Sequence, residues 1–264
     1  MRDIQVSLHH AVPLSGTTGG TESADRVADV LLLLMDSTEP LGVTEVAAEL
    51  GMGKSVAHRV LRSLTSRNLV EQDPGTMGYL LGSAAVAMGA RALSLSKLES
   101  EAAPLLRDLR DRTEETTLLS RPVAGGRVHV AQFESPRHVR MTVELGVFRP
   151  WHAGASGKIL LAHADPEFRE RAIALESEQY DLDQDAIAAL NRDLDHARER
   201  GYVMSSGERN PDAGAVAAPV FGVRGVVIAA ISVCGPRSRL TSARAERIAP
   251  LLLSVTRQVS ARLS

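Results

Sequence analysis

The sequence has few cysteines and few aromatic residues. Cys234 is the only cysteine among 264 residues, so no intrachain disulfide can form, and one chain cannot build a zinc site from several thiolates. Aromatic residues make up 3% of the chain, whereas hydrophobic residues make up 44%. Aliphatic side chains and alanine must therefore fill the core, and the length allows one large domain or two smaller ones.

Long apolar runs are also missing. The longest, Val30–Met35 and Val226–Ile231, are far shorter than the roughly 20 residues that a membrane helix needs. Residues 1–20 lack the apolar segment of a secretory signal and are rich in Gly, Ser, Thr and His, so we expect a loose tail there and a cytoplasmic protein without a membrane segment. The net charge of −2 means that any surface for nucleic acid must be local.

One segment, Gly51–Leu64, carries an apolar stripe and a basic stripe at helical spacing. The apolar positions are Ala57, Val60, Leu61 and Leu64. The basic side chains between Gly51 and Val70 are Lys54, His58, Arg59, Arg62 and Arg67, with no acidic residue among them. A solvated helix usually includes acidic partners for such charges, whereas DNA phosphates would neutralise them here. An ordinary exposed helix face is the alternative interpretation.

The surrounding pattern predicts a winged helix-turn-helix. Helices are expected over 23–35, over 45–50 with Thr44 as its cap, and over 53–66. A hairpin of Leu69–Val70 and Tyr79–Leu81 follows, with a turn at Asp73–Thr76. The third helix of this fold enters the major groove with its N-terminal residues near the bases. The expected DNA-binding residues are Thr44, Lys54, Ser55, His58, Arg59, Arg62 and Thr76; of these, Arg59, Arg62 and Thr76 are expected at phosphates.

The rest of the chain predicts a linker helix and a second domain. The heptad-spaced residues Leu81, Ala85, Met88, Ala92 and Leu95 predict an apolar seam on a helix over 83–98. Strands are then expected over 116–123, 127–134, 139–143, 202–205, 215–220 and 226–233, and helices over 155–164, over 186–200 and after Thr241. The expected organisation is α+β: a tail (1–20), a DNA-binding domain (21–82), the linker helix, and a sheet with helices around it (99–264).

Three segments resemble the IclR family of bacterial transcriptional regulators. They are "GMGKSVAHRVLRSLTSRNLVEQ", "AGASGKILLAHADP" (Ala153–Pro166) and "AAPVFGVRGVVIAAISVCGPRSRLT" (Ala217–Thr241). The resemblance runs in order over nearly all of the chain from about Ser23. It implies a GAF-like second domain, a homodimer or homotetramer, and a small-molecule effector such as an organic acid. A two-fold dimer would read a palindromic DNA operator, and repressor is taken as the default role.

The resemblance also implies an effector pocket lined by Ala155, Ser156, Ser232 and Cys234. Met141 and Leu145 could supply an apolar wall, and Glu208 and Arg209 could close the loop side. Backbone N–H groups and the helix dipole at Gly154–Lys158 would favour a carboxylate. His152 and Ile159 break the Walker pattern there, so ATP is not expected, and neither is any other cofactor or a metal. Alternatively, these small residues only let the helix pack tightly.

Two other functions remain open. An enzyme could be built on the C-terminal domain, since His129, His138, His152 and His163 are candidate bases. However, no order of nucleophile, base and carboxylate is recognisable, and none of these histidines has a metal-ligand partner at helical spacing. A protein-interaction module that uses the apolar seam is the other possibility. The sequence does not name the effector, the operator, or the direction of the response.

Overall fold

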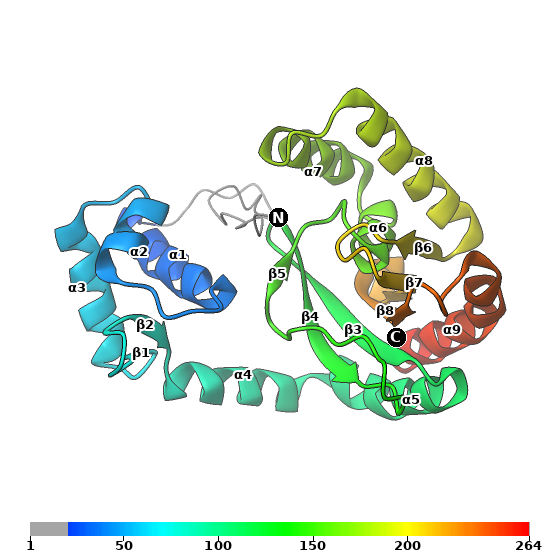
Figure 1. Ribbon diagram of the computed structural model, residues 1–264, viewed down its shortest axis with the longest axis horizontal. Coiled ribbons are helices and arrows are strands. Elements are labelled where there is room, and N and C mark those ends of the chain that lie inside the picture. Colours follow the sequence, from blue (N-terminus) through cyan, green and yellow to red (C-terminus); the bar gives the residue numbers. More distant parts are fainter. Residues whose placement is uncertain (1–20, 264) are drawn as a thin grey trace. The chain divides into compact units, whose positions relative to one another are not determined.

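The computed structural model describes residues 21–263, which leaves the expected loose tail of residues 1–20 outside the described part. The chain divides into two compact units, Met1–Ser96 and Lys97–Ser264. Figure 1 labels the helices and strands of both. Within the described part, no helix is long and apolar enough to cross a membrane.

The N-terminal unit is a winged helix-turn-helix followed by a helix, as predicted. Its elements are α1 (Glu22–Asp36), α2 (Val43–Glu49), α3 (Lys54–Thr65), β1 (Val70–Gln72), β2 (Tyr79–Leu81) and α4 (Ser83–Leu95). The strands β1 and β2 pair antiparallel. The apolar stripe of α3 lies in the core, with Ala57 and Leu61 fully buried, so burial of this stripe fixes which side of α3 faces outward.

The ends of α2 and α3 show where sequence signals succeeded and failed. Gly51 and Asn68 follow the two helices with φ of 58° and 55°, the left-handed conformation that ends helices. The prediction of Thr44 as the cap is wrong, because α2 begins two residues earlier than expected, at Val43, with Gly42 as its N-cap. The Glu45 carboxylate accepts a hydrogen bond from the Gly42 N–H at 2.6 Å, so the acidic side chain satisfies the helix start instead of the threonine.

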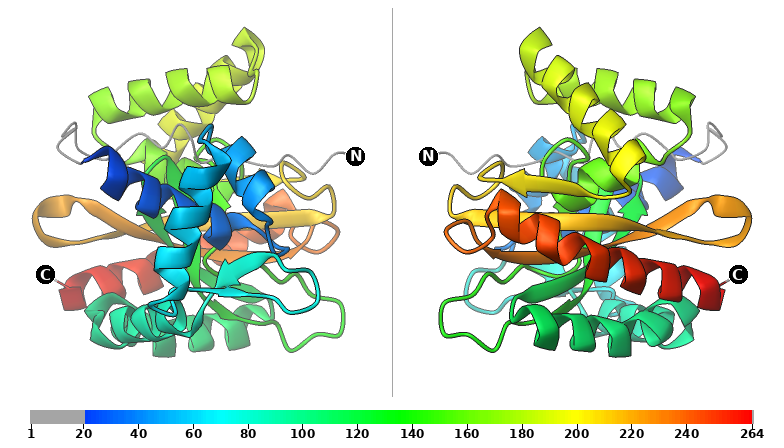
Figure 2. Two further views of the ribbon diagram at one scale, coloured as in Figure 1. Left: turned by 90° about the vertical axis from the view of Figure 1, so that its left-hand side faces the viewer. Right: turned by 90° about the vertical axis from the view of Figure 1, so that its right-hand side faces the viewer.

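The C-terminal unit is a six-stranded antiparallel sheet with helices on both faces (Figure 2). The strand order is β5-β4-β3-β8-β7-β6. The strands are β3 (Thr116–Val123), β4 (Gly126–Phe133), β5 (Phe148–Arg149), β6 (Val203–Ser206), β7 (Ala213–Phe221) and β8 (Val227–Pro236). The helices are α5 (Lys97–Thr113), α6 (Ala155–Ala162), α7 (Pro166–Gln179), α8 (Gln184–Arg200) and α9 (Ser242–Leu263), and a short 3₁₀ turn covers Val223–Gly225.

Each face of this sheet has its own apolar core. On one face α5 and α9 pack with Ile231 and Val233 of β8; on the other, α6, α7 and α8 pack with Ala230. Alternate residues of β8 therefore enter different cores, which explains its nearly continuous apolar sequence. Thr241 caps α9 as expected, since its Oγ1 accepts a hydrogen bond from Arg244 N at 3.4 Å.

Two predictions about this unit need correction. The expected strand over 139–143 is wrong, because that segment has no strand partner and the strand that pairs with β4 is β5. The helix α7 was not expected, although Asp165 and Pro166 signal a helix start. The Asp165 carboxylate accepts hydrogen bonds from Glu167 N and Phe168 N, as an N-cap should.

Candidate functional site

The outer face of α3 is positively charged and free of acidic partners. Lys54, Ser55, His58, Arg59 and Arg62 are exposed. Across residues 21–263, no carboxylate lies within ion-pair distance of Lys54, Arg59 or Arg62. The protein itself therefore leaves this charge uncompensated, and an external polyanion can neutralise it.

The two predicted threonines flank α3 in the fold. Thr44 is exposed in the first turn of α2, and Thr76 is exposed in the turn between β1 and β2. The backbone N–H and the hydroxyl of Thr76 both donate to the Asp73 carboxylate at 2.7 Å, and the same bonds lower the pKa of Asp73. Thr76 thus has a structural role in the turn, besides the predicted contact with a phosphate.

A cavity of about 420 Å³ lies in the C-terminal unit beside the start of α6. Six of the seven residues predicted to bind an effector line it: Met141, Ala155, Ser156, Glu208, Ser232 and Cys234. The seventh, Leu145, is not part of the lining and is 50% exposed. It precedes Gly146, which has a φ of 79° and donates its N–H to His129 O, so the chain turns directly after Leu145, whereas the preceding Glu144 still lines the cavity.

The same cavity contains basic residues that the sequence analysis did not place there. They are Arg127 and His129 of β4 and Arg149 of β5. Arg209, which was expected with Glu208 on the loop side, also lines the cavity. Arg127 and His129 are two positions apart on one strand, so they face the same side, and this spacing was the available signal. Arg149 has an ion pair with Glu144 at 3.3 Å, whereas Arg209 has none within the described part of the chain.

Arg127 and His129 are almost fully buried. The Arg127 guanidinium donates to Pro150 O and Ala153 O, while its Nε has no partner among the described residues. Burial, followed by repulsion from Arg209, lowers the pKa of Arg127 to about 9. Burial, followed by repulsion from Arg127, lowers the pKa of His129 to about 3. The imidazole is therefore neutral at pH 7, and the guanidinium groups remain cationic.

His129 should make the C-terminal unit sensitive to acid. Its unfolded pKa is near 6.5 and its folded pKa is about 3, so between these values the unfolded chain binds a proton that the folded chain does not. Lowering the pH from about 7 to about 5 should therefore cost about 2 kcal/mol of unfolding free energy through His129 alone. His129→Gln should remove this component, which urea titrations followed by the fluorescence of Trp151, the chain's single tryptophan, would measure.

The matched control is His138→Gln, because His138 is exposed and should not alter the acid sensitivity. Identical losses of stability between the two pH values in the wild type and in His129→Gln would contradict the buried, neutral histidine.

Two serine hydroxyls and the Cys234 thiol also line the cavity. Ser156 Oγ donates to Ser232 Oγ at 3.1 Å, which ties α6 to β8. Burial raises the pKa of the Cys234 thiol to about 11, so it stays protonated and carries no negative charge. With cationic Arg149 and Arg209 at its wall, the cavity suits a small anion that has an apolar body.

The start of α6 combines close packing with the cavity wall. A Cβ at Gly157 would lie 2.3 Å from the carbonyl oxygen of Trp151, so this glycine allows tight packing, as the alternative interpretation holds. Gly154 N donates to the Glu208 carboxylate at 2.9 Å, and Ala155 N donates to Ser205 Oγ at 3.0 Å. Both the packing role and the lining role therefore occur in this segment, at different residues.

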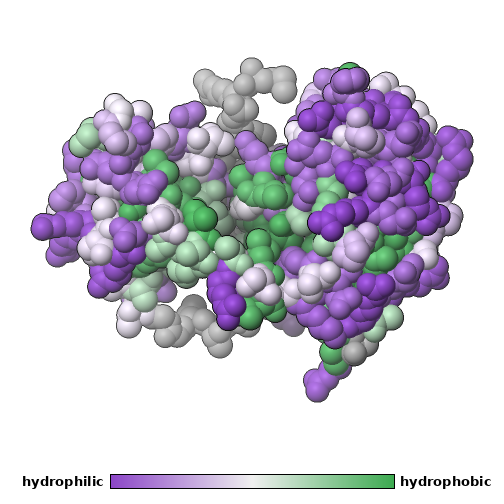
Figure 3. All heavy atoms as spheres, turned by 90° about the horizontal axis from the view of Figure 1, so that it is seen from below, coloured by the Kyte–Doolittle hydropathy of each residue, from purple (hydrophilic) through white to green (hydrophobic). Residues whose placement is uncertain are grey.

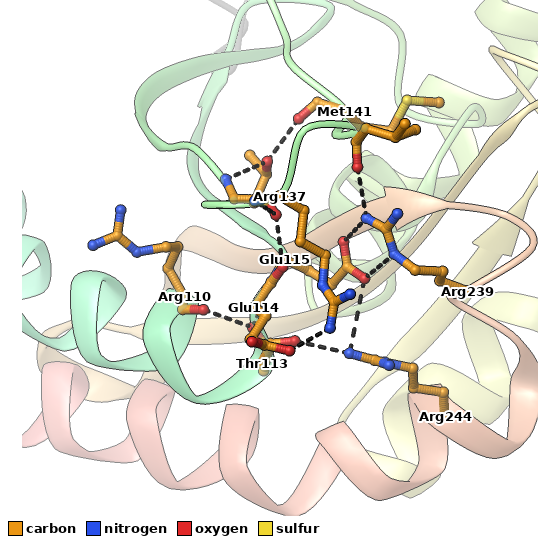
Figure 4. Close-up of polar contacts among 11 residues, drawn as sticks. Arg110, Thr113, Glu114, Glu115, Arg137, Met141, Arg239 and Arg244 are labelled. Atoms are coloured by element: carbon orange, nitrogen blue, oxygen red, sulfur yellow. Dashed lines mark hydrogen bonds and ion pairs between the residues drawn. The ribbon is translucent and has the colours of Figure 1, made fainter.

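The loop that carries Met141 is held by a buried carboxylate (Figure 4). Glu115 is fully buried and accepts two hydrogen bonds of 2.8 Å from Arg239. Arg239 also donates to Val139 O at 2.9 Å, and Thr116 Oγ1 donates to Met141 O at 2.6 Å. Side chains from the sheet and from the segment before α9 thus replace the strand pairing that was expected for 139–143.

The four histidines of the enzyme hypothesis do not converge. Only His129 lines the cavity. His152 Nδ1 lies 2.9 Å from the Glu176 carboxylate, and the ring of His163 packs on Phe221. Within residues 21–263, no group of three or more His, Cys, Asp or Glu side chains could hold a metal ion.

Comparisons with known proteins relate both units of the chain to the same family. Residues 23–74 match the family model described as the IclR helix-turn-helix domain, and residues 90–261 match the one described as the bacterial transcriptional regulator IclR C-terminal domain. The HTH-type transcriptional regulator BhcR of Paracoccus denitrificans is 34% identical over 92% of this chain and 88% of its own. The glycerol operon regulatory protein of Streptomyces griseus is 32% identical over 83% and 86%.

Solved structures agree with the fold. A crystal structure of an IclR transcriptional regulator from Alicyclobacillus acidocaldarius superposes with a TM-score of 0.80 and 29% identity, covering 93% of this chain and 100% of that one. The shared order of a helix-turn-helix unit and an α/β unit confirms the predicted fold class.

Proposed function

Because the chain belongs to the IclR family of bacterial transcriptional regulators, we propose that it represses transcription at a palindromic operator and responds to a small organic acid. It is a DNA-binding regulator rather than an enzyme, since its relatives are named as regulators and repressors. The observation that carries the proposal is the exposed face of α3, on which Lys54, Arg59 and Arg62 have no acidic partner among residues 21–263.

DNA recognition follows from the helix-turn-helix geometry. The N-terminal residues of α3 would meet base edges, and the arginines further along would contact phosphates. Selection of bound duplexes from a random pool, followed by sequencing, tests this proposal. We expect enrichment of an inverted repeat. Enrichment of a single half-site would contradict the proposal of a palindromic operator. No enrichment even at low salt would contradict the proposal that the protein binds a specific DNA sequence.

A two-fold dimer would bind such a repeat, and α4 supplies a surface for pairing. None of its residues is buried, and Val86, Met88, Leu93 and Leu95 are exposed hydrophobic side chains. Figure 3 shows hydrophobic residues gathered along this part of the surface. Of the predicted seam, Ala85, Met88, Ala92 and Leu95 lie on α4, whereas Leu81 belongs to β2 and packs on the core of its own unit. A second copy of α4 would cover the exposed seam residues.

Charge placed in this seam should therefore separate the dimer. Met88→Glu combined with Leu95→Glu puts like charges opposite each other across the two-fold axis, and sedimentation velocity should show monomers at concentrations where the wild type is dimeric. Ala87→Glu combined with Ser94→Glu adds the same charge to the same helix outside the seam and should leave the dimer intact. Equal behaviour of the two double variants would argue against pairing through α4.

The effector would occupy the cavity beside α6. Arg209, Arg149 and the N–H groups near the start of α6 favour a carboxylate, while Met141 and Leu118 supply apolar contacts. Thermal unfolding in the presence of small aliphatic and aromatic carboxylates tests this, because a bound ligand raises the unfolding temperature. An effector must also change the affinity for the selected operator, since it acts only through a difference in affinity between two states.

A further inference from the structure

Glu208 places a carboxylate of the protein itself at the start of α6. Its Oε2 accepts the hydrogen bond from Gly154 N at 2.9 Å, and its Oε1 accepts one from Lys158 Nζ at 2.6 Å. A helix N-terminus of this kind favours negative charge, because its first N–H groups have no partner within the helix. The position at which the sequence predicted the effector carboxylate is therefore already occupied by Glu208.

Glu208 can leave this position without leaving a buried charge unpaired. The Lys158 side chain is only 7% exposed, and an unpaired ammonium there would be costly. Lys158 Nζ, however, also donates to the Asp193 carboxylate of α8 at 2.6 Å. Burial tends to lower the pKa of Lys158, but Glu208 and Asp193 together raise it. If Glu208 moves away, Asp193 still neutralises the lysine.

The loop that carries Glu208 is hydrogen-bonded to the start of α6 through this carboxylate. Within residues 21–263, both hydrogen bonds between the loop of residues 207–212 and the start of α6 end on Glu208. The base of the loop is held separately, because Gly207 N donates to Ala213 O at 2.9 Å and Arg237 N donates to Asp212 O at 2.6 Å. The Glu208 side chain is 29% exposed, so water can solvate the carboxylate once it is released.

Polar groups that could bind a ligand lie in the cavity near the contact between Glu208 and Gly154. His129 is 3% exposed, lines the cavity, and forms its hydrogen bond with Ser120 through Nδ1, which leaves Nε2 for a ligand. Arg127 Nε is buried without a partner in the described part of the chain, and Arg209 lines the same cavity as Glu208. These groups favour an anion that enters next to Gly154, where Glu208 now lies.

We propose that Glu208 is an internal ligand, whose carboxylate holds the start of α6 until the carboxylate of an effector displaces it. This inference rests on the proposed effector function of the cavity. Competition from Glu208 reduces the apparent affinity for every carboxylate, because each must replace a partner that is already bound. Release of Glu208 also frees the tip of the loop, residues 208–211, while its base stays held, so the tip differs between the free and the bound protein.

Truncation of Glu208 should create a site for a simple carboxylate. In Glu208→Ala, sodium acetate should bind at the start of α6 with a Kd at least about tenfold lower than in the wild-type protein, because the competing charge-assisted bonds are gone. Acetate should then raise the unfolding temperature of the variant in a saturable manner, with sodium chloride at equal ionic strength as the reference. Trp151, three residues before Gly154, provides a second readout by fluorescence.

The matched control is Asp212→Ala, which removes one negative charge from the same loop; Asp212 is exposed and contacts the protein there through its backbone. Its affinity for acetate should equal that of the wild type. Should Glu208→Ala fail to fold, Glu208→Ser is titrated in the same way. Equal acetate affinity in the truncated and wild-type proteins, absence of binding in both, or equal gains in the two loop variants would overturn the proposal.

These outcomes are separate from the test of the regulator itself. The acetate titration uses no DNA and requires no knowledge of the natural effector. A negative result would therefore contradict the proposed role of Glu208 without affecting the proposal that the protein binds an operator. A failed operator selection, in turn, would not change the acetate titration.

Discussion

Simultaneous replacement of Arg59 and Arg62 by alanine should weaken operator binding by about a hundredfold, while the fold remains intact. Both side chains are exposed on α3 and have no acidic partner in the described part of the chain. Their removal should therefore cost little stability. If each contacts one phosphate, the slope of log K against log salt should become shallower by about two. Fluorescence anisotropy with the selected operator at several salt concentrations measures both quantities.

The control for this experiment removes the same charge from the other unit. Arg247 and Arg257 are exposed on α9, and their joint replacement by alanine should leave the salt slope unchanged. A loss of affinity of similar size in both double variants would show that DNA senses overall charge, not the face of α3. An unchanged affinity in Arg59→Ala/Arg62→Ala would place the DNA contact elsewhere.

Replacement of Glu115 by glutamine should destabilise the C-terminal unit by about 3 kcal/mol. Glu115 is fully buried and accepts two hydrogen bonds from the Arg239 guanidinium, with Arg244 3.8 Å away. Glutamine keeps the shape but removes the charge, so two arginines lose their common partner. Chemical unfolding followed by Trp151 fluorescence reports on this unit, because Trp151 is the only tryptophan and lies within it.

The neighbouring residue provides the matched control. Glu114 forms an ion pair with Arg137, and both side chains are well exposed, so Glu114→Gln should cost less than about 1 kcal/mol. Equal destabilisation by the two variants would mean that the buried ion pairs of Glu115 contribute no more to the free energy of unfolding than the exposed ion pair of Glu114. Because Arg239 also holds Val139, Glu115→Gln should in addition weaken carboxylate binding in the cavity that the same loop borders.

Local signals predicted the elements well where they were strong. The strands β3 and β2 begin and end as expected, because β-branched residues or a tight turn mark their boundaries. The prediction of a strand over 139–143 was wrong for a physical reason. The residues of this segment favour extended backbone, but its backbone groups form hydrogen bonds with the side chains of Thr116, Gln132 and Arg239. Extended conformation is a local property, whereas pairing in a sheet depends on which neighbours the fold supplies.

The candidate sites divide in the same way. The basic face of α3 could be predicted because helical spacing alone places Ser55, Arg59 and Arg62 away from Ala57 and Leu61. The cavity could be predicted only in part. Ser232 and Cys234 share a face through strand alternation, but Arg149 and Arg209 come from separate elements, and their convergence depends on the strand order of the sheet.

The order of the elements, the winged helix-turn-helix, and the outward side of α3 follow from the amino-acid sequence, since periodicity and turn chemistry act over short distances. The group that occupies the start of α6, in contrast, depends on contacts that form only in the folded chain. Glu208 lies more than fifty positions from Gly154 along the chain, and no local pattern reports a contact of that range. Sheet pairing between β6 and β7 brings the loop to α6, and charge then holds it there.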